Sequence, residues 1–319
     1  PRAASRVFSD RYTLPKTNRF GEYMVAVPDL AVVTDPLAWV VLVTFAGSAL
    51  LASRESPYER HAATASWAIF ALFWALMIPH YAIVQRSIVE GALSVVAVPA
   101  TLYVAWLIWT GRRSFAVLTQ AVAIMGFIYL PFEAITFLRS GSIELVARNV
   151  EAILGLLGVE PTVITGPDGL RSTFVFFAED GHRLTTRVVL ACTGIGSISI
   201  VAGLTMAVDA APKRQALGIA IAVPIIYGLN VLRVAFIALA HGFQWFAGFR
   251  EPIFFLFRIE DPYLVSYIVA DRVISQSLSL VVLILITLGL LRLVPELGTV
   301  VEDVLYLLTG TDYDIELGS

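Results

Sequence analysis

Seven apolar segments of helical length, separated by short polar breaks, constrain this chain more than any other feature. They comprise residues 37–52, 62–84, 91–109, 115–138, 188–208, 215–240 and 263–291. About 20 apolar residues in a helix cross the roughly 30 Å hydrocarbon core of a bilayer, and most of these segments reach that length. The composition agrees, since 58% of residues are hydrophobic and only 15% are charged. We therefore predict an all-α polytopic membrane protein with about seven transmembrane helices.

Three parts follow along the chain. Residues 1–30 are polar and lack the apolar core of a signal peptide, so we interpret them as an N-terminal extension or a cloning remnant. Residues 31–292 form the transmembrane domain, and residues 293–319 form an acidic tail with a short amphipathic helix. The net charge of −3 is too small to indicate a nucleic-acid partner.

One substantial extramembrane insertion, residues 139–187, interrupts the transmembrane domain. Its first half has apolar residues at helical spacing. Its second half has two short strand-like runs and the turn sequences 166–169 (GPDG) and 179–181 (EDG), which predict a small β-hairpin. The predicted hairpin leads directly into the fifth apolar segment.

Basic residues in the short loops predict the orientation. They occur in alternate connections: Arg54 and Arg60, Arg112 and Arg113, Lys213 and Arg214. Loops rich in arginine and lysine usually stay in the cytoplasm. We therefore expect the N-terminus and the 139–187 insertion outside, and the C-terminal tail in the cytoplasm.

Three side chains within or beside the apolar segments are the candidate catalytic residues: Cys192, Arg233 and Arg272. At 1.5 Å per helical residue, Cys192 would lie roughly 6 Å inside the outer boundary, and the two arginines roughly 12 to 14 Å inside it. Charges inside a bilayer are costly and usually functional. Cys192 is the only cysteine, which excludes an internal disulfide and leaves the thiol to packing or chemistry.

The pattern favours nucleophilic catalysis. A thiol attacks as its thiolate, which two nearby guanidinium groups and a helix start would stabilise. Gly194 and Gly196 would let a substrate backbone approach. An arginine is too weak an acid to act as a general base at neutral pH, but its donors can bind a tetrahedral oxyanion.

Other polar residues allow more than one interpretation. Asn230 could cap backbone groups freed at Pro224, or it could orient Arg233. His241 could transfer protons or could simply be solvated. Asp271 is by itself a poor partner for the adjacent Arg272, because neighbouring helical residues diverge by about 100°. The histidines lack the spacing of metal ligands, so we expect no metal, and nothing indicates a soluble cofactor.

Two motifs and their order resemble the exosortase/archaeosortase family. The motifs are residues 191–197 (ACTGIGS) and 230–234 (NVLRV), followed by the single residue Arg272. The resemblance covers about residues 37–291. Many bacterial members have histidine at the third position, so Arg272 leaves the general base unassigned.

The resemblance implies a sortase-like cysteine transpeptidase at the extracytoplasmic side of the cell membrane. Its substrates would be exported proteins with a C-terminal signal: a Pro-Gly-Phe-type motif, a transmembrane helix and a basic tail. Cys192 would form a thioester that a membrane lipid then resolves, with Arg233 and Arg272 stabilising the thiolate and the oxyanion.

Two other classes of function are compatible with the residues. A transporter could bind an anionic substrate through the intramembrane arginines. A scaffold protein could use the 139–187 insertion as a docking surface. Replacing Cys192 separates these from the enzyme, because only the enzyme needs the thiol.

Overall fold

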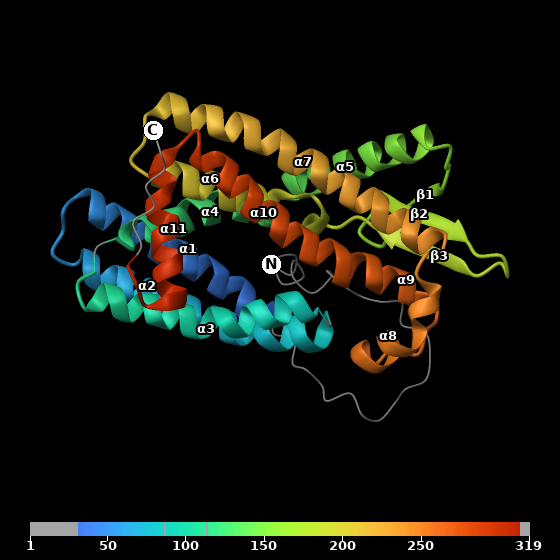
Figure 1. Ribbon diagram of the computed structural model, residues 1–319, viewed down its shortest axis with the longest axis horizontal. Helices are drawn as coiled ribbons and strands as arrows, with labels where there is room; N and C mark the ends of the chain where they lie inside the picture. Colours follow the sequence, from blue (N-terminus) through green and yellow to red (C-terminus); the bar gives the residue numbers. More distant parts are fainter. Residues whose placement is uncertain (1–30, 86, 113, 313–319) are drawn as a thin grey trace. The chain divides into compact units, whose positions relative to one another are not determined.

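The computed structural model describes residues 31–85, 87–112 and 114–312, so the predicted extension 1–30 lies outside the described residues. Figure 1 shows helices and one small sheet. The α-helices are α1 (Ala31–Ser53), α2 (Glu59–Pro79), α3 (Ile88–Trp109), α4 (Ala116–Ala134), α5 (Thr136–Leu156), α6 (Ile195–Ala207), α7 (Pro212–Gly242), α8 (Arg250–Phe257), α9 (Leu264–Ile268), α10 (Gln276–Leu291) and α11 (Gly298–Thr309). The strands are β1 (Thr162–Thr165), β2 (Arg171–Phe177) and β3 (Arg183–Arg187).

Six helical stretches within the described residues are long and apolar enough to cross a membrane. They are Val32–Ser53, Glu59–Val84, Ile88–Trp109, Ala116–Ala134, Pro212–Gly242 and Leu264–Leu291. A helix satisfies its own backbone hydrogen bonds, as a segment in hydrocarbon must. The predicted fold class is confirmed: the chain is a multi-pass membrane protein, mostly helical, with a small sheet.

The fifth predicted span, residues 188–208, is wrong in its first third. Helix α6 begins only at Ile195 and has 13 residues, about 20 Å of helix. Val189 is still extended (φ −123°, ψ 171°), and Gly194 has a left-handed backbone with φ of +78°. Both conformations are incompatible with a continuous helix, so Cys192 lies before α6 rather than four residues inside it.

The fourth predicted span, residues 115–138, also needs correction at its end. Helix α4 ends at Ala134, and α5 begins at Thr136 after the extended residue Ile135 (φ −92°, ψ 109°). Helix α5 is the amphipathic helix predicted in the insertion. It buries Ile143, Val146, Val150 and Leu154 on one face.

The chain forms two compact units, described here separately. The first contains α1, α2, α3 and α11, within residues 31–130, 202–215 and 291–312. Its core includes Phe45 and Trp67, whose rings meet edge to face at 5.2 Å, and Trp67 Nε1 donates to Thr119 Oγ1 (2.9 Å). Arg112 lies 3.5 Å above the Tyr306 ring of α11, the amphipathic helix predicted in the tail.

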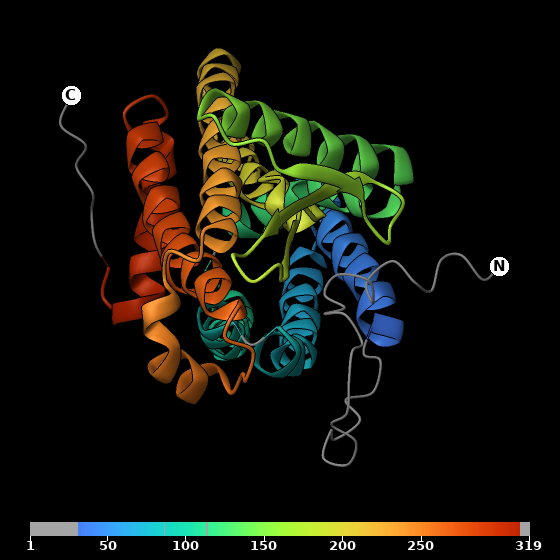
Figure 2. The same ribbon diagram turned by 90° about the vertical axis from the view of Figure 1, so that its right-hand side faces the viewer.

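The second unit, residues 131–201 and 216–290, contains α5, the sheet and most of α7. Phe174, Leu184 and Val188 lie in one buried cluster with residues of α5 and α7. Figure 2 shows α5 lying across the sheet. Arg171 of β2 makes a double hydrogen bond to Glu151 of α5, with both distances 2.7 Å, and this lowers the pKa of Glu151.

The sheet has three antiparallel strands in the order β1-β2-β3, one more than the predicted hairpin. Both predicted turns are present. Gly169 and Gly181 adopt left-handed conformations (φ +79° and +82°), which glycine adopts without a Cβ clash. The third strand follows the second turn and ends five residues before Cys192, so the sheet positions the segment that carries the thiol.

Candidate active site

A single 3₁₀ turn, η4 (Leu190–Cys192), carries the thiol between β3 and α6. The Cys192 N–H donates to the Val189 carbonyl (2.8 Å). The Thr193 hydroxyl donates to the Leu190 carbonyl (2.7 Å), and Thr193 is almost completely buried. Cys192 is free and half-buried at the edge of the core between the sheet and α7. The thiol therefore lies on a short turn held by local hydrogen bonds.

Asn230 of α7 fixes this turn from the other side. Its Nδ2 donates to the carbonyl of Cys192. This contact differs from the two roles predicted for Asn230, capping near Pro224 and orienting Arg233. Helix α7 continues through Pro224 without a break, and the Asn230 amide connects α7 to the turn that bears Cys192.

Gly194 allows Asn230 to come this close. A Cβ added at Gly194 would lie 3.3 Å from Asn230 Cβ and 3.4 Å from its Cγ, and the φ of +78° already disfavours any side chain. Gly196, two residues later, has no neighbouring atom within 4 Å of an added Cβ. The two glycines of the ACTGIGS motif therefore differ, and only Gly194 is required by the backbone.

Gly194→Ala is expected to lower the free energy of unfolding by about 1 to 2 kcal/mol, the usual cost of a left-handed L-residue. Gly196→Ala is the matched control and should be neutral or slightly stabilising, because alanine favours the helix that Gly196 occupies. Thermal denaturation of the purified proteins in detergent measures both. Equal midpoints for the two variants would contradict this role for Gly194.

The carboxylate of Asp271 forms ion pairs with both candidate arginines. Arg233 Nη2 donates to Asp271 Oδ1 (2.9 Å), and Arg272 Nε lies 3.5 Å from Asp271 Oδ2. The Asp271 and Arg272 residues are each 8% exposed. The expectation that Asp271 is a poor partner is wrong, because it is the carboxylate that both guanidinium groups share.

The local helix type explains why that expectation failed. Residues Val269–Ser275 form a π-helix, η6, in which the Gln276 N–H donates five residues back to the Asp271 carbonyl. A π-helix has more residues per turn than an α-helix, so the usual angle of 100° between neighbours does not apply. Such segments occur frequently at functional sites. Here Asp271 faces Arg233 of α7, and Arg272 remains beside it.

The three charged side chains act on the thiol in two opposite senses, the two arginines in one and Asp271 in the other. The charges of Arg233, Asp271 and Arg272 all influence the Cys192 sulfur, with Arg233 the strongest of the three. Arg233 Nε is buried and has no hydrogen-bond partner among the described residues. An oxygen atom of a bound substrate could accept a hydrogen bond from this donor. The site thus combines a thiol, a cluster of two arginines and one aspartate, and a buried donor without a partner among the described residues.

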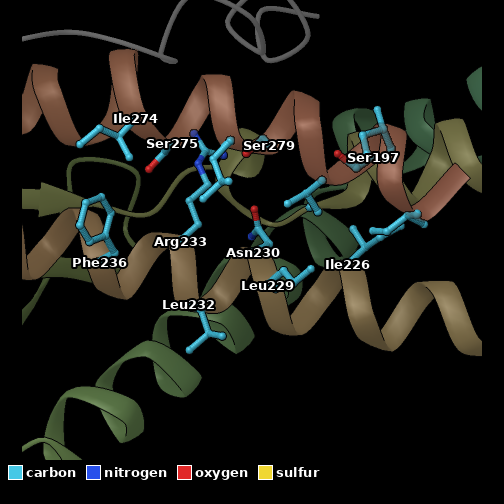
Figure 3. A pocket seen from close by; sticks show the side chains of 15 residues that line it. Ser197, Ile226, Leu229, Asn230, Leu232, Arg233, Phe236, Ile274, Ser275 and Ser279 are labelled. Carbon is cyan, nitrogen blue, oxygen red and sulfur yellow. The ribbon is translucent and has the colours of Figure 1, made fainter. Parts of the chain in front are cut away.

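A cavity of about 340 Å³ opens beside Arg233 between α7, η6 and α10. Figure 3 shows Arg233 and Asn230 pointing from α7 toward η6 and α10, with Ser275 and Ser279 along the facing wall. The rest of the wall is mostly apolar, including Leu229, Leu278 and Ile286. The cavity has the size and character of a small-molecule or single-chain site, with its polar groups near Asn230 and Arg233.

His241, a candidate supporting residue, lies apart from the thiol at the last turn of α7. It is eight residues beyond Arg233, about 12 Å along the helix. It is buried (3% exposed), so the solvated interpretation is wrong, and its ring meets Tyr267 edge to face at 5.6 Å. Among the described residues, no three histidine, cysteine, aspartate or glutamate side chains gather around a possible metal ion.

Comparisons with known proteins identify the relatives of this chain. The model of the transmembrane exosortase family matches residues 33–260, which include Cys192, Asn230 and Arg233. Archaeosortase A of Haloferax volcanii is 48% identical over 297 residues, which cover 89% of this chain and 98% of that protein. Archaeosortase A of Natronomonas pharaonis is 42% identical over 302 residues, covering 92% and 94% respectively. No solved structure gives a significant match. The chain therefore belongs to the exosortase/archaeosortase family of transmembrane proteins.

Proposed function

We propose that this protein is a cysteine transpeptidase that processes exported proteins at a C-terminal sorting signal and joins them to a membrane lipid. The observation that carries the proposal is the electrostatic influence of the Arg233–Asp271–Arg272 cluster on the only thiol of the chain. The similarity to two archaeosortases, whose name denotes a sorting enzyme, supports the same class of activity.

The first step forms a thioester. The Cys192 thiol gives its proton to water, and the thiolate attacks the carbonyl carbon of a peptide bond near the signal motif. Arg233 and Arg272 bind the negative oxygen of the tetrahedral intermediate. The C–N bond then breaks, and the departing amine, which carries the C-terminal helix and tail, takes a proton from water.

The second step transfers the exported protein. A nucleophilic group of a lipid attacks the thioester carbonyl and gives its proton to water, its bond to carbon forms, and the carbon–sulfur bond breaks. The thiolate is regenerated, and the exported protein is anchored through lipid instead of its own helix. Neither arginine has to give up a proton in this scheme, in keeping with the very weak acidity of a guanidinium group.

The basic residues in the short loops support the proposed orientation of the protein in the membrane. The basic loops around Arg54, Arg112 and Arg214 would face the cytoplasm, and the sheet and Cys192 would face outside. An exported substrate still held by its C-terminal helix would present its signal motif on that outer side. Residues 139–187 would then be the extracytoplasmic insertion, and residues 293–319 the cytoplasmic tail.

Trapping the thioester tests the proposal. Purified wild-type protein depleted of lipid should accumulate an adduct with the N-terminal part of a signal-bearing substrate, because no acceptor resolves it. The adduct should have the summed mass of the two parts by mass spectrometry and should be cleaved by neutral hydroxylamine. A substrate without the signal motif is the control. Processing that never yields an adduct, or an adduct that resists hydroxylamine, would overturn the thioester mechanism.

A further inference from the structure

Strand β3 forms one edge of the sheet and leads directly into the turn that carries Cys192. Within the described residues, β2 is the only strand hydrogen-bonded to it. The extended conformation continues past the end of the strand to Val189 (φ −123°, ψ 171°). The segment immediately before the nucleophile therefore has the backbone geometry that a further strand could join.

Two hydrogen bonds establish which backbone groups of β3 face β2. The Val188 N–H donates to the Ser172 carbonyl (2.8 Å), and the Ala178 N–H donates to the His182 carbonyl (2.9 Å). Hydrogen-bonded pairs alternate along an antiparallel ladder. The even-numbered residues of β3 thus bond to β2. The N–H and C=O groups of the odd-numbered residues, Arg183, Thr185 and Arg187, point away from β2.

Contacts at both ends hold β3 in place beside α7. Leu184 lies in the same buried cluster as Ala238 of α7. At the start of β3, the Tyr263 hydroxyl donates to Asp180, which lowers the pKa of Asp180, and the His182 ring stacks on Tyr263 at 4.0 Å. At the other end, Asn230 holds the Cys192 carbonyl. An edge fixed in this way loses little conformational freedom when a partner pairs with it.

We propose that the odd-numbered edge of β3 binds the substrate as an added strand. The bound segment is the extended stretch of the substrate that precedes the attacked peptide bond. This inference rests on the proposed transpeptidase function and deepens it by naming where the peptide is held. Strand addition supplies affinity through main-chain hydrogen bonds. The five residues of β3 span about 16 Å, enough to pair with four or five substrate residues.

The direction of the added strand follows from the site. Strand β3 runs toward Cys192, and a substrate whose C-terminal helix follows the attacked bond must also run toward Cys192. The two strands are therefore parallel. The last paired residues of the substrate lie beside Val188 and Val189, and its next carbonyl reaches the thiol.

A proline substitution on each edge of the sheet tests the proposal in the enzyme. Thr185→Pro removes an N–H that points away from β2, so it blocks the added strand and leaves the β2–β3 ladder intact. The matched control is Val163→Pro in β1, on the opposite edge. Because Val163 lies between residues that bond to β2, its N–H also points away from the sheet. Thr185→Pro should slow processing at least about tenfold, and Val163→Pro should leave processing unchanged.

A proline scan of the substrate with the wild-type enzyme provides a second test that does not depend on a variant folding. Proline at successive positions before the attacked bond should inhibit processing at every second position, because only alternate N–H groups of an added strand face β3. Inhibition without this alternation, or equal effects of Thr185→Pro and Val163→Pro, would overturn strand addition. Cys192-dependent processing of the unmodified substrate would still show that the transpeptidase itself is intact.

Discussion

Cys192→Ala is expected to leave a signal-bearing substrate at its full length, with a loss of processing of at least about 10³-fold. Removal of a catalytic nucleophile typically costs more than that. The half-buried thiol contributes little volume to the core, so the variant should reach normal levels in the membrane. The size of the substrate and its extraction from membranes, compared in cells expressing wild type or variant, provide the measurement.

The single cysteine gives this prediction an internal check. Since the chain has no other thiol, a thiol-alkylating reagent should abolish processing by the wild-type protein through Cys192 alone. Normal processing by Cys192→Ala would show that the nucleophile is assigned wrongly. The transporter and scaffold interpretations would then become the leading ones, because neither depends on a thiol.

Helix period and segment length were sufficient to predict the membrane-spanning part of the fold. Six of the seven predicted apolar segments correspond to helices of membrane length. The exception is the segment that bears Cys192, where apolar residues continue from an extended strand into a turn and then a helix. Apolar residues indicate burial but do not specify the backbone conformation. The hydropathy of the segment therefore could not show that the helix begins only after Gly194.

The site was only partly predictable for a related reason. Depth along each helix was enough to group Cys192, Arg233 and Arg272, and the structure brings their charges within reach of one another. Asp271 was excluded as an ion-pair partner because we assumed the angle of about 100° between neighbours in an α-helix. Residues Val269–Ser275 form a π-helix, to which that angle does not apply. Asn230 was noticed, but its partner is a backbone carbonyl 38 residues away, which no local pattern indicates.

The charge balance of the cluster connects its geometry to the proposed chemistry. Arg233 and Arg272 contribute +2 and Asp271 contributes −1, which leaves +1, and a Cys192 thiolate would bring the sum to zero. An unbalanced charge is costly where water is largely excluded. The same positive charge can stabilise the thiolate before attack and the oxyanion after it. Asp271 thus limits the excess charge to one and holds Arg233 in place.

Asp271→Asn is expected to reduce the rate of processing by about 10²-fold, because Arg233 is no longer held by a carboxylate. This magnitude is the usual effect of losing one donor to the oxyanion. Breaking a buried ion pair should also lower the free energy of unfolding by about 3 to 5 kcal/mol. Asp271→Glu, which keeps the charge, should retain more activity than Asp271→Asn. The matched control is Asp303→Asn in α11, a buried carboxyl group outside the site, whose replacement should leave processing unchanged.

Alkylation of Cys192 distinguishes a positioning role of Asp271 from a general loss of structure. Asp271 opposes the thiolate electrostatically, so Asp271→Asn should make Cys192 react faster with iodoacetamide at neutral pH while processing becomes slower. The labelling is measured well below the thermal midpoint of each variant, so that unfolding does not expose the thiol. If Asp271→Asn processed substrate at the wild-type rate, the shared carboxylate would have no part in catalysis. Slower labelling together with slower processing would indicate a collapsed site instead. Faster labelling with slower processing is the result expected if Asp271 positions Arg233 and Arg272 for catalysis.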